Sequence, residues 1–164
     1  MEKREMLWKP TAGRIESTEM FRYMRYVNKT RRKSFVDYPA LYQWSIDEIP
    51  DFWRSIWEFM DVIHSRGFDD ILVDGDKMPG AKWFPGARLN FAENLLRHKD
   101  TEKAALVFRS ENGSRREMSY AELFAAVERC AAGMRAMGVR AGDRVVGFMP
   151  NMPETVVAML SAAS

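Results

Sequence analysis

Hydrophobic residues recur three and four positions apart over much of the first half of the chain. Side chains at this spacing lie on one face of a helix, so the pattern predicts amphipathic helices. One helix should follow Ser17 or Thr18, and a longer one should run from Ile49 to Ile63 and end before Gly67. Their apolar faces consist of Met20, Phe21, Met24 and Val27, and of Ile49, Phe52, Trp53, Ile56, Trp57, Met60 and Ile63.

Three helix starts are indicated by capping boxes, in which serine or asparagine is followed three positions later by glutamate. The pairs are Ser45 and Glu48, Asn90 and Glu93, and Ser119 and Glu122. Each member of such a pair accepts a hydrogen bond from a backbone N–H at the helix start. The first box should open the helix that begins near Ile49, and the second a short helix from Phe91 to about His98. The third should open a long helix that Gly138 ends.

After residue 98, short apolar runs alternate with helical stretches. Ala104–Phe108 has the composition of a strand, and the turn signal Glu111–Ser114 predicts a hairpin that returns through Arg116–Met118. A second apolar run, Arg144–Met149, should be another strand. A helix should follow it, with Asn151 as its cap and Pro153 and Glu154 in its first turn. Alternating strands and helices are typical of an α/β fold, and the sheet needs more strands than these residues supply. We therefore expect a fragment.

Residues 82–96 separate the two patterns. Pro85-Gly86 is a turn signal that should hold the aromatic pair Trp83-Phe84 at a bend. We expect a structural junction here, a packed corner followed by a capped helix. It is formed by Trp83, Phe84, Pro85, Gly86, Arg88, Asn90 and Glu93.

Charge and cysteine content limit the class of protein. A formal net charge of +2 over 164 residues gives no indication of a polyanionic partner. The basic run Lys29–Lys33 is short, so a solvated loop is a simpler interpretation than a nucleic-acid site. The single cysteine, Cys130, excludes an internal disulfide and fits a reducing compartment. No apolar run suggests a signal peptide or a membrane span. We expect a cytoplasmic protein that binds neither membranes nor nucleic acid.

Two stretches resemble ligand-binding motifs but lack features that those motifs require. Asp69, Asp70, Asp74 and Asp76 have the composition of a calcium loop but not its spacing. Residues 75–82 resemble a phosphate-binding loop but lack its Gly-Lys-Ser/Thr ending. We therefore predict no catalytic, cofactor-binding or metal-binding residue in this sequence.

Several longer stretches carry a family resemblance. They are Leu-Trp-Lys-Pro-Thr-Ala at residues 7–12, Tyr-Pro-Ala-Leu-Tyr-Gln-Trp-Ser-Ile at 38–46, residues 78–96 and residues 144–154. Together they resemble the N-terminal part of the acetoacetyl-CoA synthetases, which are AMP-forming acyl-CoA ligases of the adenylate-forming superfamily. Acetyl-CoA synthetases share the Trp-Phe turn and the Leu-Asn pair but continue differently after Asn94, so the resemblance favours acetoacetate over acetate as substrate.

The resemblance implies a fold and an activity. Residues 1–37 should be a lead-in with a helix, residues 38–98 an acetyl-CoA-synthetase-type N-terminal domain, and residues 99–164 the truncated start of an AMP-binding (adenylation) domain. The full enzyme would use ATP, CoA and Mg²⁺ to convert acetoacetate to an acyl-adenylate and then to a thioester. The family's nucleotide-binding and catalytic motifs lie downstream of residue 164, so this chain alone should be inactive.

Other functions remain as alternatives. One is an acetyl-CoA synthetase or related short-chain ligase. Another is a non-enzymatic helical binding module that docks through Phe52, Trp53, Ile56 and Trp57. The third is a nucleic-acid binder that uses Lys29–Lys33.

Overall fold

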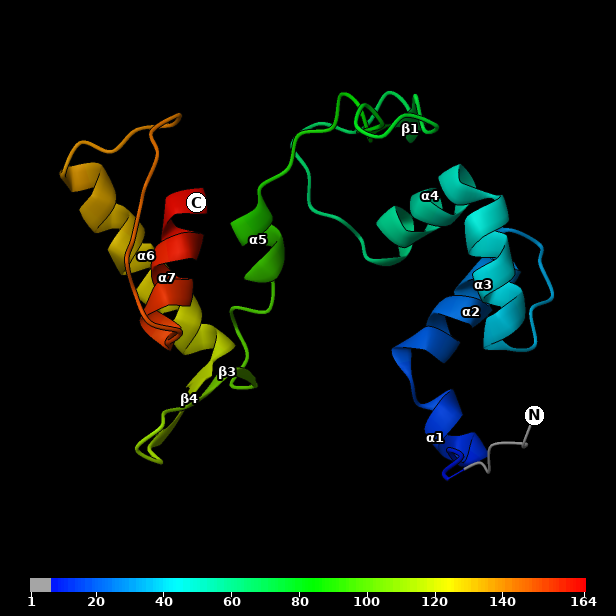
Figure 1. Ribbon diagram of the computed structural model, residues 1–164, viewed down its shortest axis with the longest axis horizontal. Coiled ribbons are helices and arrows are strands. Elements are labelled where there is room, and N and C mark those ends of the chain that lie inside the picture. Colours follow the sequence, from blue (N-terminus) through cyan, green and yellow to red (C-terminus); the bar gives the residue numbers. More distant parts are fainter. Residues whose placement is uncertain (1–6) are drawn as a thin grey trace. The chain divides into compact units, whose positions relative to one another are not determined.

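The computed structural model describes residues 7–164, whose helices and strands fall into two compact units (Figure 1). The first unit contains the residues up to Val62 together with 68–86, and the second contains 63–67 and 87–164. The elements of the first unit are α1 (Ala12–Glu16), α2 (Glu19–Thr30), α3 (Tyr38–Asp47), α4 (Ile49–Phe59), β1 (Leu72–Val73) and β2 (Lys82–Trp83). Those of the second are α5 (Phe91–Leu95), β3 (Ala104–Arg109), β4 (Arg115–Ser119), α6 (Tyr120–Ala136) and α7 (Pro153–Ala163).

Helix α2 begins where the sequence predicts. Thr18 is its N-cap, and the Thr18 hydroxyl accepts a hydrogen bond of 3.2 Å from the backbone N–H of Phe21. Met24 and Val27 are buried as expected, but Met20 is half exposed and Tyr23 takes its place in the core. The core of the first unit consists of Tyr23, Met24, Val27, Leu41 and Trp44, with Phe52 and Phe59 packed against it.

The predicted cap at Ser45 is wrong. Ser45 lies inside α3, and its hydroxyl donates to the carbonyl oxygen of Tyr42. Helix α3 is capped instead by Asp37, whose side chain accepts a hydrogen bond of 3.0 Å from the N–H of Ala40. Helix α4 starts after Glu48, whose side chain makes no cap hydrogen bond and lies 2.8 Å from Lys33 Nζ. Helix α4 also ends earlier than predicted, at Phe59 rather than near Ile63.

The basic run is not simply a solvated loop, because α2 extends to Thr30 and Arg31 is largely covered by α4. Only 16% of the Arg31 side chain is exposed. Its Nε donates to Asp51 Oδ1 at 2.9 Å and its Nη2 to Glu58 Oε2 at 2.8 Å. Tyr26 also donates to Glu58 Oε2, at 3.0 Å. This network, Arg31 with Asp51, Glu58 and Tyr26, ties α2 to α4.

The hairpin and the long helix of the second unit agree with the sequence patterns. Strands β3 and β4 pair antiparallel, with Val107 opposite Glu117 and Phe108 opposite Arg116. Both hydrogen bonds of the Ser119–Glu122 capping box are present at the start of α6. Helices α6 and α7 lie side by side over the hairpin (Figure 1). The buried core comprises Ala92, Leu96, Leu123, Val127 and Leu160.

The predicted strand Arg144–Met149 is not formed. These residues belong to no sheet and connect the end of α6 to the start of α7. A strand needs a neighbour for its backbone hydrogen bonds, and no described residue supplies one. Asn151 does not cap α7 either; Met152 holds the N-cap position without a side-chain bond, and Pro153 follows it.

Candidate functional site

The first part of the predicted junction is an aromatic corner in the first unit. The Trp83 ring meets Trp53 edge to face, with 5.6 Å between ring centroids. The Phe84 ring lies 4.9 Å from Trp57 and 5.4 Å from Phe68, measured between centroids. Phe84 adopts a positive φ of 45°, and its N–H donates to the carbonyl oxygen of Ile71 at 2.8 Å. The bend therefore packs Trp83 and Phe84 against the aromatic rings of α4.

Pro85 and Gly86 form the turn of this corner. The carbonyl oxygen of Pro85 accepts a hydrogen bond of 2.8 Å from the N–H of Asp69. Gly86 has a φ of 85°, and a Cβ added there would overlap the Asp69 carboxylate. Glycine is therefore required here twice over, by its backbone conformation and by the close approach of a side chain.

The second part of the junction belongs to the second unit and is held by backbone hydrogen bonds. Arg88 exchanges them with Arg66, and its carbonyl oxygen also accepts from Ser65 at 2.8 Å. Asn90 caps α5: its Oδ1 accepts from the N–H of Glu93 at 3.0 Å, and its Nδ2 donates to the carbonyl oxygen of Ala163 at 2.8 Å. Asn90 thus connects α5 to the last turn of α7, which the sequence did not predict. Helix α5 itself is shorter than expected and ends at Leu95.

Asn94 is a structural residue that the sequence analysis missed. Its Oδ1 accepts from the N–H of Ile63 and its Nδ2 donates to the carbonyl oxygen of Ile63, both at 2.9 Å. A side-chain amide that matches a backbone N–H and C=O in this way acts as a one-residue strand partner. No local sequence signal could identify the pairing, because the two residues are 31 positions apart.

Arg116 and Glu154 form a second unforeseen contact, between β4 and α7. The guanidinium donates from Nη1 and Nη2 to the two carboxylate oxygens, each at 2.9 Å. These hydrogen bonds lower the pKa of Glu154 and raise that of Arg116. The guanidinium carbon also lies 5.4 Å from the centroid of the Phe108 ring. Arg116 therefore links β3, β4 and the first turn of α7.

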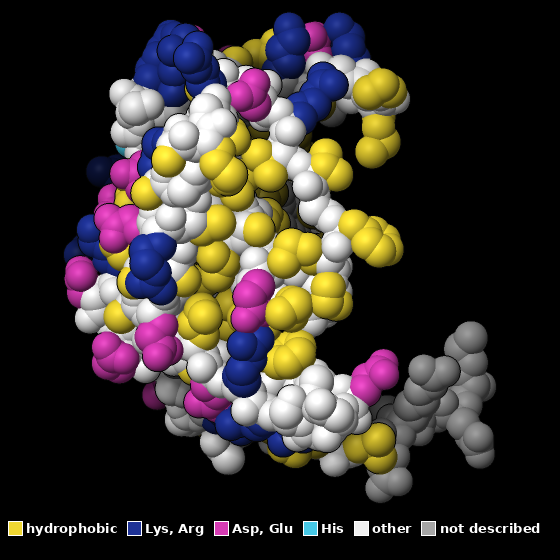
Figure 2. Space-filling view, turned by 90° about the vertical axis from the view of Figure 1, so that its left-hand side faces the viewer, with side chains coloured by type: hydrophobic (Ala, Val, Ile, Leu, Met, Phe, Trp, Pro, Cys, Tyr) yellow, Lys and Arg dark blue, Asp and Glu magenta, His cyan; other side chains and the backbone are white. Residues whose placement is uncertain are grey.

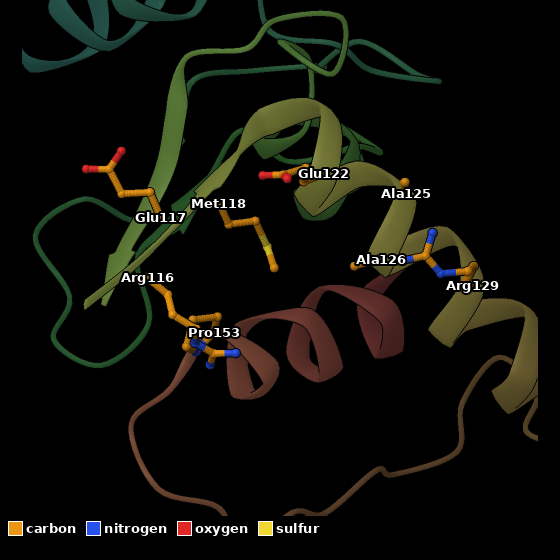
Figure 3. Close-up of a pocket in the computed structure, with 8 residues that line it drawn as sticks. All are labelled: Arg116, Glu117, Met118, Glu122, Ala125, Ala126, Arg129 and Pro153. Atoms are coloured by element: carbon orange, nitrogen blue, oxygen red, sulfur yellow. The ribbon is translucent and has the colours of Figure 1, made fainter. Parts of the chain in front are cut away.

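A surface pocket of about 360 Å³ lies beside this contact, between β4, α6 and the start of α7 (Figure 3). Met118 points into it, Ala125 and Ala126 lie along its α6 wall, and Arg116 lies next to Pro153 (Figure 3). Three of its charged groups already have protein partners: Arg116 with Glu154, Glu117 with Arg115, and Glu122 with the backbone of Ser119. The lining therefore has an apolar floor, and most of the charged side chains around it take part in ion pairs or in the cap of α6. It contains neither an acid and a base paired for catalysis nor a nucleophile beside a base.

Among residues 7–164, no three His, Cys, Asp or Glu side chains could together hold a metal ion. No helix in that range is long and apolar enough to cross a membrane.

Comparisons with known proteins give a consistent family assignment. The family model described as "Acetyl-coenzyme A synthetase N-terminus" matches residues 38–95, and that described as "AMP-binding enzyme" matches residues 91–164. Acetoacetyl-coenzyme A synthetase of Rhizobium meliloti (strain 1021) is 43% identical over all 164 residues, and acetoacetyl-CoA synthetase of Xenopus tropicalis is 39% identical over 98% of the chain. The solved structure of acetoacetyl-CoA synthetase from Streptomyces lividans covers 98% of the chain at 40% identity with a TM-score of 0.85.

The chain spans about a quarter of the length of these relatives: 25% of the Rhizobium protein, 24% of the Xenopus protein and 25% of the Streptomyces chain. The α/β fold expected from the sequence is confirmed by the structural match. The chain is therefore a homologue of the acetoacetyl-CoA synthetases, and over its whole length it matches the N-terminal quarter of these AMP-binding enzymes.

Proposed function

We propose that this chain is the N-terminal part of an acetoacetate–CoA ligase. In the whole enzyme, the carboxylate of acetoacetate would attack the α-phosphate of ATP, forming an acyl-adenylate and releasing pyrophosphate. The thiol of CoA would then attack the acyl carbon, forming the thioester and releasing AMP. The observation that carries the proposal is 43% identity to an acetoacetyl-CoA synthetase across every residue of the chain. The role of the present residues is structural, and ATP, CoA and Mg²⁺ would be held by residues outside this sequence.

The proposed organisation follows the sequence analysis, with a lead-in at 1–37, an N-terminal domain at 38–98 and the start of an adenylation domain at 99–164. The junction formed by Trp83, Phe84, Pro85, Gly86, Arg88, Asn90 and Glu93 lies near the end of this N-terminal domain and would fix the course of the chain before the adenylation domain starts. The proposed location is the cytoplasm, which the single cysteine supports because it permits no internal disulfide. The proposed partner is a small carboxylic acid.

The substrate can be tested on the native protein. An antibody raised against residues 17–34 would enrich it from an extract of the source cells. The enriched protein, supplied with ATP, CoA and Mg²⁺, should release AMP faster with acetoacetate than with acetate. Faster release with acetate would favour the acetyl-CoA synthetase alternative, and no release with either acid would contradict the ligase proposal.

The isolated chain supplies a second test. The 164 residues alone should not catalyse exchange between pyrophosphate and ATP in the presence of acetoacetate, because the residues that bind nucleotide lie elsewhere. Acetoacetate-dependent exchange by the purified chain would show that this assignment of roles is wrong.

A further inference from the structure

The pocket between β4, α6 and the start of α7 combines an apolar floor with a cation at its edge. Helix α6 carries alanine where it lines the pocket, at Ala125 and Ala126, whereas its larger side chains Leu123 and Val127 pack into the core. Met118 points into the hollow from β4 (Figure 3). Small side chains leave space, and the flexible methionine adapts to what fills that space. The floor therefore suits an aliphatic chain.

The charged side chains of the lining differ in what they contact. Arg116 is held by Glu154, and Glu117 by Arg115. The Arg129 side chain forms no ion pair or hydrogen bond with any residue that the structure describes. Its guanidinium extends back along α6 toward the pocket (Figure 3). Arg129 is therefore the guanidinium of the lining that is available to an anion.

The place of Glu122 sets the direction in which an anionic ligand lies. Glu122 precedes Arg129 by two helical turns on α6, which is about 10 Å along the helix axis. Its carboxylate accepts a hydrogen bond of 2.8 Å from the N–H of Ser119 and repels a second negative charge. The anionic group of a ligand therefore belongs at the Arg129 end, and its apolar part lies along the floor.

The volume of the pocket limits the size of the ligand. About 360 Å³ corresponds to about twelve water molecules at about 30 Å³ each, which suits a ligand of about ten non-hydrogen atoms. This volume lies at the lower end of the range that is usual for small-molecule pockets. An unbranched carboxylic acid such as octanoate has this size, together with the apolar chain and the single negative charge that the lining requires.

We propose that this pocket binds a linear aliphatic carboxylate of medium length. The Arg129 guanidinium donates charge-assisted hydrogen bonds to the carboxylate, and the chain lies over Met118, Ala125 and Ala126. Burial of the chain adds a favourable apolar contribution. The inference does not depend on the proposed ligase activity, because the binding needs neither ATP nor CoA.

The test is an NMR titration of the isotope-labelled 164-residue chain with octanoate. Amide signals of β4 and of residues 122–129 should shift and then reach saturation. Octanol lacks the charge and should bind about fivefold more weakly, which is the usual upper effect of a surface ion pair. Acetate lacks the chain and should bind roughly tenfold more weakly or worse. Equal binding of either compound and octanoate would overturn the proposal.

Two substitutions test the two parts of the pocket. Arg129→Gln should weaken octanoate binding by about fivefold. Its control, Arg140→Gln, removes the same charge outside the pocket and should leave binding unchanged. Ala126→Leu fills the hollow and should weaken binding by roughly tenfold or more. Its control, Ala132→Leu, makes the same change at an exposed position of α6. Circular dichroism should be the same for all four variants, and unchanged binding by Arg129→Gln or Ala126→Leu would overturn the proposal.

The titration also separates the pocket from other apolar surface. Figure 2 shows a face on which hydrophobic side chains gather in the middle and charged side chains lie mainly around them. Outside the pocket, Val146 and Phe148 are strongly exposed. Octanoate that adhered to such surface would shift the signals of residues 144–149 and would bind both pocket variants as well as the unmodified chain. That result would also overturn the proposal.

Discussion

Gly86 and Gly113 have nearly the same backbone conformation, with φ values of 85° and 83°, but different surroundings. A Cβ at Gly113 would meet nothing within 4 Å, whereas one at Gly86 would overlap the Asp69 carboxylate. Gly113→Ala should therefore lower the free energy of unfolding by about 1 kcal/mol, the cost of a left-handed alanine. Gly86→Ala should cost roughly twice as much or more, since the Asp69 side chain must also move. Urea denaturation followed by circular dichroism measures both. Equal losses would contradict the close approach at Gly86.

Glu58 should make the first unit sensitive to acid. Burial alone raises the pKa of its carboxyl, but hydrogen bonds from Arg31 and Tyr26 outweigh burial and hold that pKa below its usual range. The pKa is thus lower in the folded than in the unfolded chain. The stabilisation is complete above about pH 4.3 and is lost as the pH falls through the folded-state pKa.

The substitution Glu58→Gln should therefore lower stability at pH 7 and flatten the dependence of stability on pH below about pH 4.3. The urea midpoint measured between pH 3 and pH 7 tests this. Glu19→Gln is the control at pH 7, because Glu19 pairs with Arg22 on the open surface and such a pair contributes little. If Glu58→Gln left the pH profile unchanged, the network would not be the source of the acid sensitivity.

At the scale of helices, two serines with similar sequence contexts have different roles. Ser119 begins α6 with a complete capping box, whereas Ser45 lies inside α3. Ser119→Ala should lower the free energy of unfolding by about 1 kcal/mol, the usual cost of losing an N-cap. Ser45→Ala should have almost no effect, since it removes only a bond to a carbonyl oxygen in its own helix. Urea denaturation of the two variants tests this prediction. A larger loss of unfolding free energy for Ser45→Ala than for Ser119→Ala would indicate that Ser45 caps a helix, as the sequence predicts.

The contrast between these serines shows how far the sequence predicts the elements. The Ser119 box, the β3–β4 hairpin and the cap at Asn90 depend on residues close together in the chain, and all three were predicted. The start of α4 was not, because Glu48 pairs with Lys33 and Asp37 caps the preceding helix. The Arg31 network was mistaken for a solvated loop for the same reason, since its acidic partners lie 20 and 27 positions away.

The absent strand at residues 144–149 differs from these cases. The apolar pattern predicts a strand that the structure does not form, because a strand is a property of a pair and no described residue is its partner. For the candidate site, the sequence predicted that no catalytic residue would be found and named the residues of the junction. It could not foresee Asn94 or the Arg116–Glu154 contact, because both join distant parts of the chain.

At the scale of the whole molecule, each unit has its own core, and that of the second centres on Leu160, which is 2% exposed. Leu160→Ala should destabilise this unit by about 2–5 kcal/mol, because it leaves a cavity between α6 and α7. Amide hydrogen exchange across residues 104–164 should quicken accordingly. Met159→Ala changes the neighbouring, half-exposed side chain on the same helix and should leave exchange nearly unchanged. Similar exchange in both variants would show that Leu160 is not central to the core.

The aromatic corner has a practical consequence for optical work on this protein. All five tryptophans lie between residues 8 and 83, within the first unit, so intrinsic tryptophan emission reports on that unit alone. The second unit contains no tryptophan, so a tryptophan introduced there could act as a fluorescent reporter for that unit. Val146→Trp would place one in the segment between α6 and α7, at a side chain that is now in water. Its emission should shift to the blue whenever apolar groups cover it, so burial of this segment would give a direct spectroscopic signal.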